Sequence, residues 1–127
     1  MPRKYADLCT LILRAGFFAC IALLVVLSWL PGDAMVRTGA SGRVEHAVAY
    51  FGTAIMMGLA YRERPGLRVQ TLLLVVLAAI LEVGQLYMSG RSPGFLDFAA
   101  SSTGAALGSL VMWAVRPNLL SYLGLDS

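Results

Sequence analysis

The sequence predicts an all-α integral membrane protein, a bundle of four transmembrane helices forming a single domain. Hydrophobic residues make up 58% of the 127 residues, and charged residues only 13%. Soluble domains carry about 25% charged residues, and a chain this short cannot hide so much apolar surface inside itself. The apolar residues fall into four consecutive runs separated by short polar segments. The bilayer is therefore the expected solvent.

The first run covers residues 8–30 and contains one charge, Arg14, which we expect to reach the nearer membrane interface. A basic start before an apolar stretch is also typical of a cleaved signal peptide. This run is long for one, and no good small-x-small cleavage site follows Leu30. Cys9 and Cys20 are eleven residues apart, roughly 16 Å along a helix, which is too far for a disulfide within it.

Three further apolar runs follow at residues 43–61, 69–88 and 95–115. The third run has twenty residues, enough to cross a hydrocarbon core of roughly 30 Å. Arg116 and Pro117 are expected to end the fourth run, leaving residues 118–127 as a mildly amphipathic tail. The connecting segments are rich in Pro, Gly, Ser or Arg and lie at 31–42, 62–68 and 89–94. A backbone in lipid must satisfy its own hydrogen bonds, so each run predicts a helix.

Lysine and arginine residues divide unequally between the two sides of such a bundle. With four spans both termini share one side, which receives seven basic residues: Arg3, Lys4, Arg14, Arg62, Arg64, Arg68 and Arg116. The opposite side receives three: Arg37, Arg43 and Arg91. The positive-inside rule predicts a multi-pass protein of the cytoplasmic membrane with both termini in the cytoplasm. Segments 31–42 and 89–94 then face outward.

Most ionisable groups within the runs fall in the outward half of this bundle. Arg43, His46 and Tyr50 are spaced three and four apart and share one helix face, as do Glu82 and Gln85. Glu82 lies roughly 9 Å inside the end of its helix. An unpaired carboxylate there costs several kcal/mol, so it should face the bundle interior and find a partner.

The turn and the fourth run complete the polar cluster. The candidate partners of Glu82 are His46, Gln85 and Arg91, and Arg91 is the only arginine in the hairpin. One stripe of the fourth run carries, at spacings of four, three and four, Asp97, Ser101, Gly104 and Gly108. The two glycines form G-x-x-x-G, which predicts close helix packing.

The same polar groups also have a purely structural interpretation. Polar side chains hold membrane helices together at about 0.6–2 kcal/mol each. The sequence has no C-x-x-C, P-loop or G-x-S-x-G motif, and His46 is its only histidine, which excludes a multi-histidine metal site. His46 with Glu82 and Asp97 is only a weak pattern for a divalent cation. We expect no metal, no cofactor and, because the basic residues do not form one patch, no nucleic-acid partner.

These spaced residues resemble the pattern of the VanZ-like family of small bacterial membrane proteins. The family has a basic residue three before a histidine and a tyrosine four after it, here Arg43, His46 and Tyr50. It continues with Glu-x-x-Gln, an arginine after a turn, an aspartate, a polar residue and two glycines, here Glu82, Gln85, Arg91, Asp97, Ser101, Gly104 and Gly108. The chain departs at Gly42, where the family often has an acidic residue, and at Ser101, where it has asparagine.

The resemblance implies a role in the bacterial cell envelope, where the family's namesake is associated with teicoplanin resistance. In one hypothesis an outward-facing polar pocket binds a lipid-linked envelope precursor or a glycopeptide-like ligand, with Arg43 and Arg91 contacting anionic groups. In the other, His46 is a general acid or base tuned by Glu82 and oriented by Asp97, while Arg91 stabilises a phosphate or carboxylate. No nucleophile motif is recognisable, which favours binding or a structural role.

Overall fold

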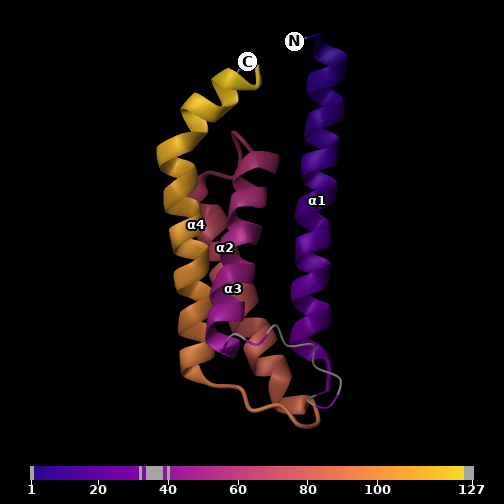
Figure 1. Cartoon of the computed structure of the whole chain (residues 1–127), viewed down its shortest axis with the longest axis vertical. Helices are drawn as coiled ribbons and strands as arrows, with labels where there is room; N and C mark the ends of the chain where they lie inside the picture. Colours follow the sequence, from indigo (N-terminus) through magenta and orange to yellow (C-terminus); the bar gives the residue numbers. More distant parts are fainter. Residues whose placement is uncertain (1, 32, 34–38, 40, 125–127) are drawn as a thin grey trace.

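The computed structural model describes residues 2–31, 33, 39 and 41–124. Within these residues the chain is all-helical (Figure 1), with four long helices and one short 3-10 helix: α1 (Arg3–Trp29), α2 (Gly42–Ala60), α3 (Leu67–Gly84), η2 (Gln85–Tyr87) and α4 (Phe95–Tyr122). Consecutive helices run in opposite directions. The start of α1 and the end of α4 lie together at what we call the terminal end, and the α3–α4 connection and the start of α2 lie at the hairpin end.

The helix bounds follow the predicted runs closely for α2 and differ elsewhere. α1 begins at Arg3 instead of Leu8, since Pro2 can precede a helix and its carbonyl accepts from the amides of Tyr5 and Ala6. The regular turns of α3 end at Gly84, and η2 tightens the last turn before the hairpin. Most of the loop predicted at residues 31–42 lies outside the described residues.

The prediction that Arg116 and Pro117 end the last helix is wrong. α4 continues through Pro117 to Tyr122, so the start of the predicted tail is helical, while residues 125–127 lie outside the described part of the chain. Proline removes one backbone hydrogen bond and bends a helix without having to stop it. The last turns of α4 do bend relative to its main axis (Figure 1).

Three of the helices are long and apolar enough to cross a membrane: α1, α3 extended by η2, and α4. Large apolar side chains on their outer surfaces are exposed, including Leu11, Ile12, Leu72, Ile80 and Leu110. Contiguous apolar surface of this kind is unfavourable in water and favourable in lipid.

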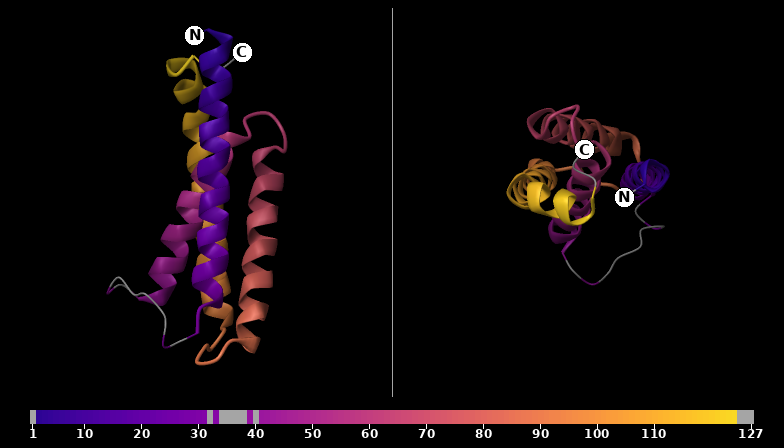
Figure 2. Two further views of the ribbon diagram at one scale, coloured as in Figure 1. Left: turned by 90° about the vertical axis from the view of Figure 1, so that its right-hand side faces the viewer. Right: turned by 90° about the horizontal axis from the view of Figure 1, so that it is seen from above.

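The helix that does not meet the same measure, α2, is shorter and begins with polar residues. It lies between the other three helices and packs most extensively against α4 (Figure 2). Its buried face carries Tyr50, Thr53, Ala54 and Met57. Because protein covers much of α2, this helix needs less apolar surface than its neighbours.

Glycines set how closely α2 and α4 approach. A Cβ atom on Gly104 would overlap the backbone carbonyl of Ala47, and one on Gly108 would lie 2.6 Å from the carbonyl oxygen of Phe51. Gly104 and Gly108, like Ala47 and Phe51, are one helical turn apart, so the two backbones meet along two successive turns. This contact positions the polar start of α2 beside the start of α4.

Candidate functional site

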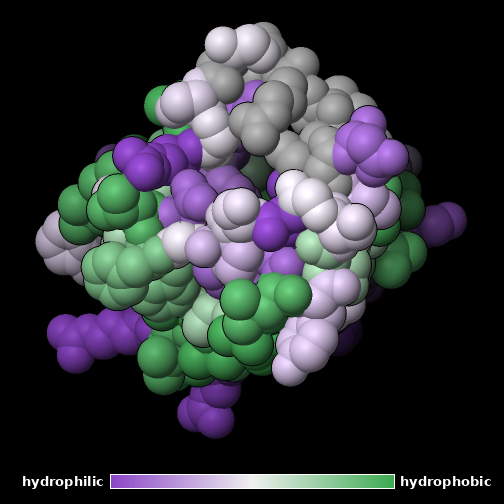
Figure 3. Space-filling view, turned by 90° about the horizontal axis from the view of Figure 1, so that it is seen from below, coloured by the Kyte–Doolittle hydropathy of each residue, from purple (hydrophilic) through white to green (hydrophobic). Residues whose placement is uncertain are grey.

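Hydrophilic side chains gather at the hairpin end, between the helix ends (Figure 3). Arg43 and Asp97 form an ion pair there, with Nε and Oδ1 3.8 Å apart, joining the first turn of α2 to the first turn of α4. The Arg43 side chain is 61% exposed, so solvent screens the pair and its contribution to stability is at most about 1 kcal/mol. Arg43 therefore remains accessible to a ligand from outside the bundle.

Glu82 holds the start of α4. Its Oε1 accepts a hydrogen bond of 2.7 Å from the backbone N–H of Gly94, the residue immediately before the helix. Carboxylates are favourable at helix N-termini because the helix dipole is positive there. Glu82 thus closes the α3–α4 hairpin through a backbone donor.

Arg91 holds the end of α1. Its Nε donates to the carbonyl oxygen of Leu30 at 3.0 Å, and its Nη2 donates to that of Ser28 at 2.9 Å and to that of Leu27. The last carbonyls of a helix lack partners within the helix, and the dipole favours a cation beside them. The structure therefore gives Arg91 and Glu82 different partners, in place of the candidate pairing between them.

Three predicted site residues are buried beneath these contacts. Tyr50 is 1% exposed, Ser101 2% and Gln85 4%. The amide Nε2 of Gln85 is buried and has no hydrogen-bond partner among the described residues. The hairpin end thus contains a buried donor that the described residues do not satisfy.

His46 is half-buried, one helical turn before Tyr50. Within the described part of the chain, no hydrogen bond or ion pair joins His46 to Glu82 or Asp97. No group of three His, Cys, Asp or Glu residues there is arranged to hold a metal ion. The structure thus pairs Arg43 with Asp97, while His46 has no hydrogen bond or ion pair to Glu82 or Asp97 among the described residues.

A second feature, not anticipated from the sequence, lies at the terminal end. A cavity of about 560 Å³ opens there between α1, the α2–α3 turn and α4. Four of its ten lining residues are arginines: Arg14, Arg62, Arg64 and Arg116. In the sequence these residues were informative only about orientation. The sequence assigned all four arginines to the same side of the bundle, and this shared side is the signal from which their clustering could have been predicted.

The fold and the two polar ends define a class of protein: a small helical protein with three helices able to span a membrane. Comparison with models of known families gives no match, and neither characterised proteins nor solved structures give one.

Proposed function

We propose that the chain is a four-span protein of the bacterial cytoplasmic membrane, with α2 as the fourth span and the hairpin end facing outward. Three apolar helices support the membrane setting. Because consecutive helices are antiparallel, α2 must connect the ends of α1 and α3 that lie on opposite sides. The second half of α2 is apolar, as a membrane span requires, and includes Ile55, Met56, Met57 and Leu59. The resemblance to the VanZ-like pattern supports the envelope setting.

We further propose that the hairpin end binds a lipid-linked or glycopeptide-like envelope ligand without turning it over. The observation that carries this proposal is the unpartnered Nε2 of Gln85, buried at the same end as the exposed Arg43. A buried donor without an acceptor is unfavourable by about 1–3 kcal/mol. A ligand oxygen would satisfy it, while Arg43 would contact an anionic group at the rim.

The alternative, a membrane enzyme acting on a lipid-linked precursor, needs an activated acid or base. A catalytic histidine is normally oriented by a hydrogen-bonded partner. Glu82 and Asp97, the two carboxylates that could do so, contact Gly94 and Arg43 instead. This arrangement favours binding. A purely structural role is the third possibility, and it makes no use of the Gln85 donor.

Gln85→Met is expected to abolish ligand binding while leaving the melting temperature unchanged or raised. Methionine fills a similar volume and removes the unsatisfied amide, so the fold loses nothing. The measurement is retention of a labelled lipid-linked envelope precursor by the purified protein, beside thermal melting in detergent and teicoplanin susceptibility of cells expressing each variant.

Arg68→Gln, at the exposed start of α3 on the other end, is the control. Saturable retention without a new product supports binding, whereas a new product identifies an enzyme. Retention equal in wild type and Gln85→Met contradicts a site at Gln85. If neither the wild type nor Gln85→Met retains the precursor, binding is contradicted and the purely structural role is supported.

Reporters fused to the two ends of the chain are expected to show the same, cytoplasmic location. The start of α1 and the end of α4 lie together, and seven of the ten lysines and arginines are assigned to that side. A fusion within the α3–α4 hairpin, after Ser89, should report the opposite side. Opposite locations for the two termini would contradict a four-span arrangement.

A further inference from the structure

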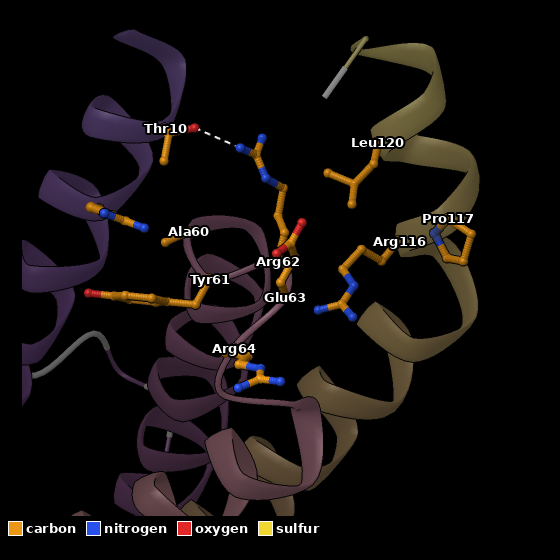
Figure 4. A pocket seen from close by; sticks show the side chains of 10 residues that line it. Thr10, Ala60, Tyr61, Arg62, Glu63, Arg64, Arg116, Pro117 and Leu120 are labelled. Atoms are coloured by element: carbon orange, nitrogen blue, oxygen red, sulfur yellow. Dashed lines mark hydrogen bonds between the residues drawn. The ribbon is translucent and has the colours of Figure 1, made fainter. Parts of the chain in front are cut away.

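The terminal end contains a concentration of positive charge around a cavity. Arg62 and Arg64 come from the α2–α3 turn, Arg116 from α4 and Arg14 from α1. Glu63, an exposed residue, is the one carboxylate among the lining residues. Figure 4 shows Arg62, Arg64 and Arg116 projecting into the space between the helices. The lining therefore has a net positive charge.

Two of the four lining arginines contact neutral groups. Arg62 donates from Nη2 to the hydroxyl oxygen of Thr10 at 2.8 Å. Arg14 lies over the ring of Tyr61, 5.2 Å from its centroid, a cation–π contact. These two contacts orient the guanidinium groups of Arg62 and Arg14 without neutralising their charge.

Two guanidinium nitrogens at this cavity are both buried and without acceptors. Nη1 of Arg62 and Nη1 of Arg116 have no hydrogen-bond partner among the described residues. The Arg43–Asp97 ion pair lies at the other end. Burying unpaired charged donors at one cavity is unfavourable unless an anion binds there.

We propose that this cavity binds a phosphate-bearing anion. Guanidinium groups match phosphate oxygens in geometry and charge, and the cavity lining supplies them from the α2–α3 turn and from α4. The volume of about 560 Å³ lies in the range of small-molecule sites. The phosphate belongs either to a phospholipid headgroup or to a soluble phosphorylated compound. This site is separate from the hairpin end and does not depend on the function proposed there.

The test uses the full-length protein in an uncharged detergent, with two probes. Inorganic phosphate is titrated by calorimetry and melting temperature, and phosphatidylglycerol binding is counted by native mass spectrometry. The double variant Arg62→Gln/Arg116→Gln is expected to bind at least about tenfold more weakly, the change for losing one charge-assisted hydrogen bond. Arg68→Gln removes one positive charge from the same end, outside the cavity lining, and so matches the single variant Arg116→Gln in charge; it should bind as wild type does.

The two probes distinguish the sources of the phosphate. Binding of inorganic phosphate indicates a soluble compound, whereas binding of phosphatidylglycerol alone indicates a lipid headgroup. Binding of neither probe overturns the proposal, as does equal weakening by Arg68→Gln, which would indicate general surface charge.

The single variant Arg116→Gln keeps the test informative if the double variant does not fold. Removing one of several like charges should leave the ligand-free melting temperature unchanged or raised, and should reduce the rise that the bound probe produces. A variant that melts lower and binds its probe unchanged assigns Arg116 a structural role and overturns the proposal.

Discussion

Gly104→Ala is expected to destabilise the bundle by about 3 kcal/mol, the upper end of the range for overpacked interiors. The added methyl group would overlap the backbone carbonyl of Ala47, and backbone atoms cannot rotate away as a side chain can. α2 and α4 must therefore move apart, and the contact that positions the hairpin end is lost. For a chain of this length the melting temperature should fall by roughly 10 °C.

Other glycines provide a graded control for this prediction. Gly108→Ala meets the carbonyl of Phe51 and the Cβ of Ala54 and should also destabilise, whereas Gly58→Ala meets only the side chain of Met112, which can move. Gly52→Ala meets nothing within 4 Å and should be neutral, or stabilising by up to about 1 kcal/mol through helix propensity. Equal melting temperatures for the Gly104 and Gly52 variants would contradict the packing of α2 on α4.

Arg91→Gln is expected to lower stability by about 2–3 kcal/mol, because it removes charge-assisted hydrogen bonds to the last carbonyls of α1. Glu82→Gln should lower it by only about 1 kcal/mol, since the glutamine carbonyl can still accept from Gly94. The two side chains hold different partners, so the effects should add to within about 0.5 kcal/mol in the double variant. Melting temperatures of the four proteins in one detergent provide the measurement.

A direct Glu82–Arg91 pair would behave differently. Neutralising both members of a buried ion pair leaves no unpaired charge, so the double variant would recover most of the stability lost by either single variant. Such recovery would contradict the arrangement in which Arg91 caps α1 and Glu82 holds α4. Arg68→Gln, which removes an exposed arginine of α3, should leave the melting temperature unchanged and controls for net charge.

The amino-acid sequence by itself determined the all-helical class and the number of long helices. These properties depend on the length and hydropathy of each run and on the turn residues between runs, all of which are local. The predicted bounds of α2 agree with the structure to within one residue at each end. The sequence also predicted that polar residues cluster at the hairpin end. In an antiparallel bundle the start of α2, the end of α3 and the start of α4 lie on the same side.

Only the tertiary structure decided which groups these residues contact. Charged side chains can be identified in a sequence. Backbone groups at helix ends are also strong hydrogen-bond partners for them, but these groups are available only where a helix ends in the folded structure. Arg91 and Glu82 both contact backbone groups for this reason. The continuation of α4 through Pro117 and the position of Arg62 and Arg116 at one cavity depend in the same way on packing. The G-x-x-x-G pattern predicted a close helix contact at Gly104 and Gly108, but only the tertiary structure shows that α2 is the helix they contact.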